Sequence, residues 1–129
     1  MKEQELFDWL KAGHYSDLEK STKEYDGFDC TSNNYKMFIE LKSRNTHYDT
    51  LLLERKKFDF LVVTADVLGY EPWYINSTPL GVWSFPLKTV VKNLEWVEKW
   101  LPTTTEFQDK SKTTKLVTFL PVELGIKLT

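Results

Sequence analysis

Residues 35–44 constrain the fold more than any other part of the chain, because they have the pattern of a single β-strand. Side chains alternate between the two faces of a strand, so Ile39 and Leu41 are predicted to point to one face. Glu40 and Lys42 are then predicted on the opposite face, with their Cα atoms roughly 6.7 Å apart. A strand that only buries one face does not need this acid–base pair, so the stretch is also the first candidate for a functional site.

A second strand is predicted just upstream, over residues 25–30, and the polar cluster 31–34 reads as the turn between the two strands. Strands joined in this way form an antiparallel hairpin, in which Asp29 and Glu40 become neighbours. The glycine at position 27 leaves the register of the first strand open, so Asp26 is an alternative to Asp29.

The rest of the chain alternates between helical and extended patterns. Helical spacing and cap signals predict helices over residues 3–12, 16–24, 48–57 and 89–101. Extended patterns predict strands over residues 58–64 and 115–121 and a hairpin of 73–77 with 82–87, with loops at 69–72 and 108–114. Continuation of the helix that starts near residue 48 through Leu68 is the alternative for the 58–64 strand, because short apolar runs fit either structure.

This order of elements predicts an α+β (mixed α/β) fold in which helices pack on a small sheet. The chain has 129 residues, of which 41% are hydrophobic and 28% charged, a balance typical of one globular domain spanning residues 1–129. No apolar run approaches the ~20 residues of a membrane span, and the N-terminus lacks the pattern of a secretory signal. A single cysteine cannot form an internal disulfide, which favours a cytoplasmic setting.

The distribution of charge is more informative than its sum. A net charge of -2 does not indicate a nucleic-acid-binding protein. Basic residues nevertheless crowd one short segment: Lys42, Arg44, Arg55, Lys56 and Lys57. A local basic surface beside a carboxylate cluster fits a phosphodiester substrate, whereas ordinary solvated charges on a helix face are the plainer interpretation.

Asp29, the sequence Glu40-Leu41-Lys42 on the following strand, and a helix bearing Glu54 and Lys57 together resemble the PD-(D/E)XK nuclease superfamily. Restriction endonucleases and Holliday-junction resolvases belong to this superfamily. The resemblance spans about residues 16–87, with Phe28 standing before Asp29 where the motif name has proline. It implies a small mixed β-sheet flanked by helices, as in the restriction-endonuclease core.

The resemblance also implies a metal-dependent endodeoxyribonuclease, with branched DNA as a candidate substrate. Asp29, Glu40 and Lys42 are the catalytic candidates. Carboxylates are hard oxygen ligands suited to Mg²⁺, with Mn²⁺ as a substitute. The implied metal ligands are Asp29, Glu40, the backbone carbonyl of Leu41, and Glu19 as the acidic residue of the first helical region. A cation and a lysine both oppose the negative charge that builds up during phosphodiester hydrolysis.

The expected partners follow from the same resemblance. Lys42, Arg44 and Lys57 are the candidate DNA contacts. Small nucleases of this kind work as homodimers, because two sites cut two strands, and the aromatic hairpin 73–87 offers a surface for that contact. Its aromatic side chains are also candidates for stacking on unpaired bases, although such residues more often fill a core. The alternative function is a noncatalytic nucleic-acid-binding or protein-interaction module of the same fold.

Overall fold

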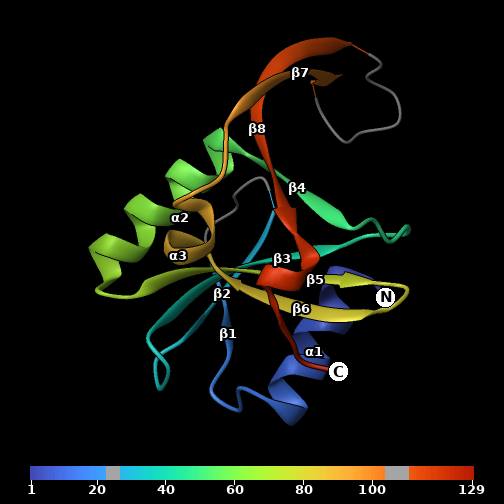
Figure 1. The fold of residues 1–129 in the computed structure, drawn as a ribbon. Coiled ribbons are helices and arrows are strands. Elements are labelled where there is room, and N and C mark those ends of the chain that lie inside the picture. Colours follow the sequence, from blue (N-terminus) through green and yellow to red (C-terminus); the bar gives the residue numbers. More distant parts are fainter. Residues whose placement is uncertain (23–26, 104–110) are drawn as a thin grey trace.

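The computed structural model describes residues 1–22, 27–103 and 111–129, which form two β-sheets and three α-helices (Figure 1). In chain order the elements are α1 (Glu3–Gly13), β1 (Glu19–Lys20), β2 (Phe28–Ser32), β3 (Met37–Ser43), β4 (Thr50–Glu54), α2 (Arg55–Leu68), β5 (Glu71–Thr78), β6 (Gly81–Pro86), α3 (Leu87–Val91), β7 (Val97–Pro102), β8 (Lys112–Pro121), the 3₁₀ turn η1 (Val122–Leu124) and β9 (Ile126–Lys127). No described helix is long and apolar enough to cross a membrane.

The larger sheet is mixed and has the strand order β1-β2-β3-β5-β6-β9. Strands β3 and β5 pair in parallel, whereas the other neighbours in this sheet are antiparallel. A parallel pair needs a crossover connection, and here β4 and α2 supply it. The smaller sheet is antiparallel, with the order β4-β8-β7.

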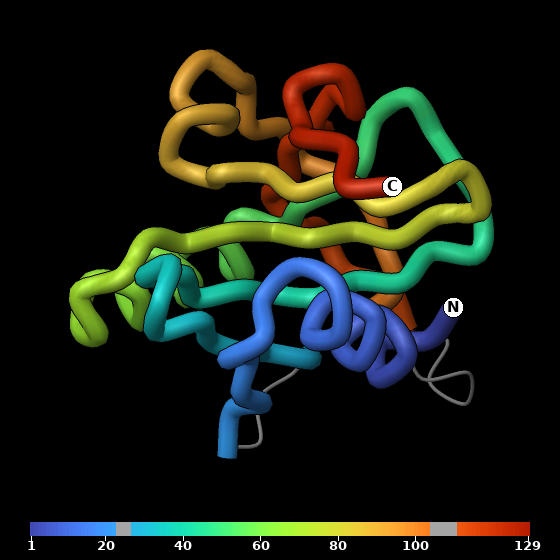
Figure 2. Tube along the Cα trace, turned by 90° about the horizontal axis from the view of Figure 1, so that it is seen from below, coloured from blue at the N-terminus to red at the C-terminus, as the bar shows by residue number. Residues whose placement is uncertain are grey.

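The larger sheet separates two hydrophobic clusters. Helix α1 covers one face, where Leu6 and Leu10 pack with Ile39 and Ile75 (Figure 2). The opposite face packs against α2, α3 and the smaller sheet, in a cluster that includes Phe38, Leu61, Tyr74, Phe85 and Leu120. Because Glu40 alternates with Ile39 along β3, its side chain lies on this second face.

The predicted α+β class is confirmed, and so are several elements. The first helix appears as α1, and the hairpin around the 31–34 region appears as the antiparallel pair β2–β3. The hairpin after residue 70 appears as β5–β6, and the final strand appears as β8. Residues 112–114 of the predicted 108–114 loop already belong to β8, and the rest of that loop, apart from Ser111, lies outside the described residues.

Two neighbouring predictions are wrong: the helix over 48–57 and the strand over 58–64. Residues 50–54 form β4, in which Leu51 and Leu53 alternate inward and pair with β8. Helix α2 then starts at Arg55 and runs to Leu68. The alternative prediction, a helix from near residue 48 that continues through Leu68, is therefore correct from residue 55 onwards. Three consecutive leucines fit both the helical and the strand spacing of apolar residues. Pairing with the distant strand β8 makes this segment a strand.

Three further predictions are wrong for the same kind of reason. The helical turn over 16–24 is replaced, in its described part, by the short strand β1, which pairs with β2. The helix over 89–101 is replaced by the short α3 followed by β7, which pairs with β8. Pro72 lies inside β5 rather than in a loop. In each case pairing with a neighbouring strand overrides the local preference.

The aromatic hairpin is part of the core. Tyr74, Trp83 and Phe85 are 5%, 7% and 0% exposed, and they pack beneath α2 and α3. The expectation that this hairpin offers its aromatic side chains to a partner subunit or to unpaired bases is therefore wrong for these three residues.

Candidate active site

Two buried carboxylates face each other across β2 and β3. Asp29 is the direct antiparallel partner of Glu40, and each residue is only 4% exposed. Directly opposed residues in an antiparallel pair carry their side chains on the same face. The structure thus brings together the two acids that the spacing of the sequence predicts as neighbours.

This carboxylate pair is short of hydrogen-bond donors. Both Asp29 side-chain oxygens and Glu40 Oε2 are buried without a donor among the described residues. A buried carboxylate without partners is costly, so such groups normally bind a cation, accept hydrogen bonds or hold a proton. Three oxygens in need of positive charge are the ligand type that Mg²⁺ or Mn²⁺ prefers. The residues present therefore fit a divalent cation.

Lys57 gives Glu40 its one described ion pair. Its Nζ atom lies 3.2 Å from Glu40 Oε1, and its side chain is 21% exposed. Lys57 stands in the first turn of α2, which the β4–α2 crossover places over β3. The sequence predicts Lys57 as a DNA contact, and the structure adds that it also reaches a catalytic candidate.

Gly27 makes room for this ion pair. Its backbone has φ +135°, and a Cβ atom built there would collide with Glu40 Oε1 and lie 2.8 Å from Lys57 Nζ. Only glycine adopts such a conformation readily. Gly27, the residue that leaves the register of the first strand open in the sequence, therefore forms one side of the site.

The setting changes the acidity of Glu40. Burial raises its pKa to about 9, with a further rise from the adjacent Asp29 carboxylate and a partial reduction from Lys57. Burial beside Asp29 thus favours the form of Glu40 that carries a proton. A bound cation would take the place of that proton.

The other predicted metal ligands lie differently. Glu19 is an exposed residue of β1, opposite Thr31, and not part of a helix. In the described part of the chain, no three His, Cys, Asp or Glu side chains gather closely enough to hold a metal ion. Leu41 directs its side chain into the α1 cluster while its backbone lies between β2 and β5. Asp26, the alternative to Asp29, lies outside the described residues.

The two remaining predicted cations have contrasting surroundings. Lys42 is half-buried on the same strand face as Glu40 and makes no ion pair with the described residues. Arg44 instead donates hydrogen bonds to Asn76 Oδ1 at 2.8 Å, to the carbonyl of Leu52 at 2.8 Å and to Tyr74 Oη at 3.1 Å. Lys42 is thus available to a substrate, whereas the guanidinium of Arg44 ties β3 to β5 and β4.

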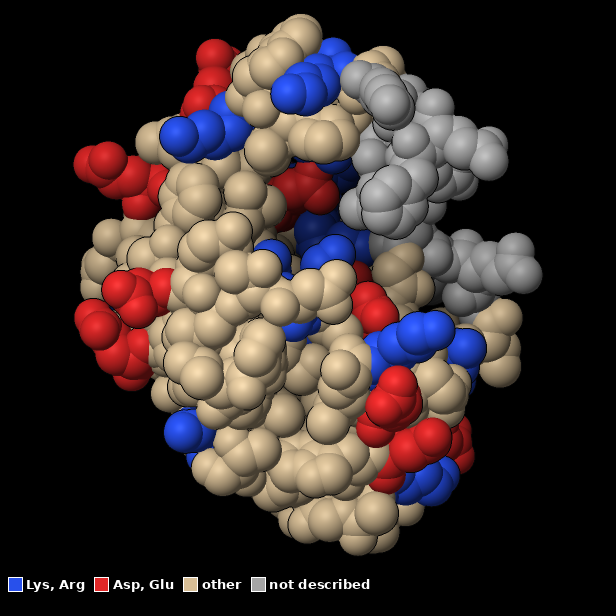
Figure 3. All heavy atoms as spheres, turned by 90° about the vertical axis from the view of Figure 1, so that its right-hand side faces the viewer, with Lys and Arg blue, Asp and Glu red and all other residues tan. Residues whose placement is uncertain are grey.

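A basic pocket lies next to the carboxylate pair, and three of its basic residues, Arg55, Lys56 and Lys57, belong to the basic segment singled out in the sequence. It has a volume of about 740 Å³ and lies between the first turns of α2 and the β7–β8 ribbon, and it is lined by Glu54, Arg55, Lys56, Lys57, Asp59, Phe60, Thr103, Thr113, Lys115 and Leu116. The space-filling view shows a hollow that contains both basic and acidic side chains (Figure 3). Since Lys115 follows Lys57 by almost sixty positions, no local sequence pattern reveals this pocket.

Comparison with solved structures identifies a similar fold. The chain is 17% identical to Hjc, a Holliday junction resolvase from the archaeal hyperthermophile Archaeoglobus fulgidus, with a TM-score of 0.63. The match covers 98% of this chain and 88% of the resolvase. No protein-family model and no curated protein matches the sequence. The resemblance to the PD-(D/E)XK superfamily is confirmed at the level of the fold, and it extends over nearly the whole chain rather than residues 16–87 alone.

Proposed function

We propose that residues 1–129 act as one domain, a metal-dependent endodeoxyribonuclease that hydrolyses phosphodiester bonds in branched DNA. The observation that carries this proposal is the buried Asp29–Glu40 pair, which leaves three carboxylate oxygens without donors. A fold of this size does not need to bury two acids together, because unpaired buried charge destabilises it. Such a cost is typical of functional sites.

Asp29 and Glu40 would hold Mg²⁺, with Mn²⁺ as a substitute, and the Leu41 carbonyl stays a predicted additional ligand. Glu19, the other predicted ligand, does not gather with this pair in the described structure. When bound, the cation supplies a counter-charge for the phosphate and a more acidic water. The protein's own contribution is to exclude bulk water from the pair and to fix both acids on adjacent strands. Asp26 stays the alternative to Asp29.

Two lysines would act on the phosphate. Lys42, two residues from Glu40 on the same face, contacts the scissile phosphate and orients the attacking water. Lys57, whose Nζ atom lies 3.2 Å from Glu40 Oε1, would hold an adjacent phosphate. Arg44 stays a predicted DNA contact, although its three internal hydrogen bonds favour a structural role.

Branched DNA is the proposed substrate because the similar structure, Hjc, is described as a Holliday junction resolvase. Cutting two strands at a junction requires two sites, so we also propose a homodimer. The basic pocket beside Lys57 gives the phosphate backbone a place to lie in a chain whose net charge is negative.

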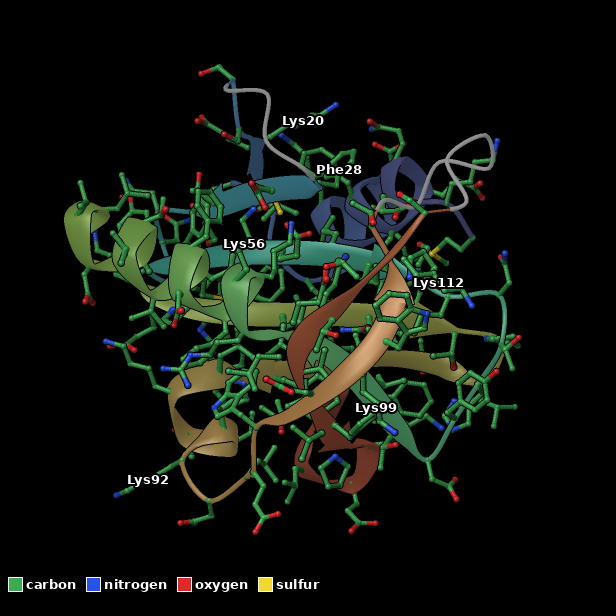
Figure 4. The ribbon with its side chains drawn as sticks, turned by 90° about the horizontal axis from the view of Figure 1, so that it is seen from above. Lys20, Phe28, Lys56, Lys92, Lys99 and Lys112 are labelled. Atoms are coloured by element: carbon green, nitrogen blue, oxygen red, sulfur yellow. The ribbon has the colours of Figure 1, made fainter. Side chains whose placement is uncertain are left out.

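The test is cleavage of matched linear, flapped and four-way DNA in Mg²⁺, with and without EDTA. We expect metal-dependent cleavage of the branched DNAs, with a loss of at least a hundredfold in Glu40→Gln and Lys42→Ala. Lys92→Ala, an exposed lysine that points away from the β7–β8 ribbon in Figure 4, serves as the control and retains activity. Cleavage that survives Lys42→Ala would rule out the proposed mechanism.

A noncatalytic module of the same fold is the second candidate. It is favoured by the Lys57–Glu40 ion pair, which already satisfies one carboxylate oxygen. Titration calorimetry with Mg²⁺ and Mn²⁺ separates the two functions. The enzyme requires binding that Glu40→Ala abolishes, whereas the noncatalytic module binds DNA but takes up no metal at this pair.

A further inference from the structure

We propose that Trp100, on the β7–β8 ribbon, stacks on an unpaired base of the bound DNA. This inference rests on the proposed function, because branched DNA supplies unpaired nucleotides where strands separate. It assigns a role to a residue that the catalytic mechanism does not use.

Trp100 is exposed in an unusual way. All five tryptophans lie in the described ranges, and Trp100 is the one with a largely exposed side chain, at 64%. No other described aromatic ring packs against it, whereas Trp96, four residues earlier, packs on Phe58 and beneath Arg55. Tryptophan offers a large apolar area and a π-face, so leaving it in water forgoes a stabilising contact unless a partner covers it.

The ribbon that carries Trp100 extends beyond the rest of the molecule (Figure 1). Strand β7 is the edge of the smaller sheet and pairs only with β8 in the described structure. Trp100 lies opposite Thr114, an exposed threonine, so no bulky neighbour blocks its face from the partner strand. An extended nucleic acid strand thus has access to the ring.

Positive charge also lies next to Trp100. Lys112 pairs with Pro102, two residues along β7 from Trp100, and therefore lies diagonally from the tryptophan on the same face of the ribbon. Figure 4 shows Lys112 on the ribbon and Lys56 beside the first turn of α2. Both lysines are exposed, and neither forms an ion pair with a described carboxylate. Lys112 is thus free to contact a phosphate next to a base stacked on Trp100.

The ribbon and the carboxylate site meet at the pocket. The ribbon lines it with Thr103, Thr113, Lys115 and Leu116, and α2 lines it with Lys57, the partner of Glu40. Thr113 and Lys115 lie on the opposite face of the ribbon from Trp100, so a strand held in this pocket would reach the ring around the edge strand β7. Cations along a groove combined with an exposed aromatic ring are the features by which proteins bind single strands.

The chemistry around Trp100 favours a nucleobase over a protein surface. Leu116, diagonal to Trp100 on the same ribbon face, is 41% exposed and adds a little apolar area. The other neighbours on that face are Thr114, Pro102, Glu98 and Lys112, which do not form the broad apolar patch that a stable protein interface needs.

The test compares Trp100→Ala and Trp100→Phe with the wild-type protein in EDTA, so that no DNA is cut. Fluorescence anisotropy measures binding to a splayed-arm duplex with unpaired thymines and to a fully paired duplex of the same length. We expect Trp100→Ala to weaken splayed-arm binding about tenfold or more, the size expected for one lost stacked base. Trp100→Phe should recover most of the affinity, and the paired duplex should bind both variants as it binds the wild type.

A matched control and a second readout complete the test. Tyr48→Ala removes another exposed aromatic ring, 62% exposed and outside the ribbon, and should leave both affinities unchanged. A 2-aminopurine base in the splayed arm should be quenched by the wild type and not by Trp100→Ala. Unchanged binding by Trp100→Ala, equal weakening for both DNAs, or a change of oligomeric state alone in sedimentation would each overturn the inference.

The two proposals fail separately. If the protein cuts no DNA in Mg²⁺ but Trp100-dependent binding of the splayed arm persists, the nuclease function is wrong and the stacking inference holds. If branched DNA is cut by Trp100→Ala at the wild-type rate and bound with wild-type affinity, the nuclease stands and the stacking inference is wrong.

Discussion

Glu40 is the residue on which most of the site depends, because its charge is opposed by burial and by Asp29 and supported by Lys57. Folded Glu40 keeps its proton up to about pH 9, whereas a glutamate in the unfolded chain loses it near pH ~4.3. Between these values the folded state holds an extra proton. The free energy of unfolding of the metal-free protein must then fall as the pH rises through this range.

The prediction is a loss on the order of 3 kcal/mol between pH 5 and pH 9 for the wild type in EDTA, and a much flatter profile for Glu40→Gln. Glutamine keeps the shape of the side chain but cannot ionise. Urea denaturation at several pH values measures both profiles. Mg²⁺ should restore the stability of the wild type at high pH and leave Glu40→Gln unchanged. Parallel profiles for the two proteins would contradict the burial argument.

Gly27 provides a second prediction at this scale. Gly27→Ala pushes a methyl group into Glu40 and Lys57 and also strains the backbone at φ +135°. We expect Mg²⁺ affinity to change and DNA cleavage to fall at least tenfold, together with a stability loss of about 1–3 kcal/mol. Gly69→Ala is the control, because Gly69 has φ +74° at the end of α2 with no atom within 4 Å of an added Cβ. It should lose stability without losing activity.

The sequence alone was sufficient to predict contacts between residues that are close along the chain. The eleven-position step from Asp29 to Glu40 is closed by a hairpin, and hairpins leave local signals in turn residues. The Lys57–Glu40 pair and the internal role of Arg44 depend on where α2 and β4 pack. No local pattern encodes such contacts, so they had to come from the structure.

Among the elements, the segment from β4 to α2 shows why strands and helices were exchanged. Leu51, Leu52 and Leu53 fit the spacing of an amphipathic helix when residues 48–57 are considered alone. Pairing with β8, more than sixty residues later, makes the segment a strand and moves the start of the helix to Arg55. This shift places Lys57 in the first turn of α2, and so at the site.

Arg44 holds these elements together, and its replacement tests that role. Its guanidinium links the end of β3 to Asn76 and Tyr74 of β5 and to Leu52 of β4. Arg44→Leu removes the donor to Asn76 Oδ1 and Tyr74 Oη and leaves the Leu52 carbonyl only the longer bond from the Tyr74 hydroxyl, at 3.5 Å. We expect it to lower the free energy of unfolding by about 3 kcal/mol. Lys92→Leu, at an exposed lysine, should stay within about 0.5 kcal/mol of the wild type. Urea denaturation measures both.

A different result for Arg44 would be equally informative. If Arg44→Leu keeps its stability while DNA affinity falls, the arginine acts mainly as the DNA contact that the sequence predicts. A loss of stability with DNA affinity preserved under folded conditions assigns it to the framework.

At the scale of the whole molecule, the negative net charge conceals a divided surface. Basic side chains gather at the pocket between α2 and the ribbon, where Arg55, Lys56, Lys57 and Lys115 outnumber Glu54 and Asp59. The composition gives only the net charge and does not show how the charged side chains are distributed over the surface. The match to Hjc over 98% of the chain likewise includes the C-terminal third, for which the sequence motif has no counterpart.

The parallel pairing of β3 with β5 has a consequence for the order in which the protein folds. Hairpin β2–β3 closes over a few residues, whereas the β3–β5 pair must wait until the whole β4–α2 crossover is ordered, which is an entropically slow step. On that order, Asp29 and Glu40 would stay exposed to water until the crossover packs, and the buried carboxylate pair would form only with the last long-range contacts.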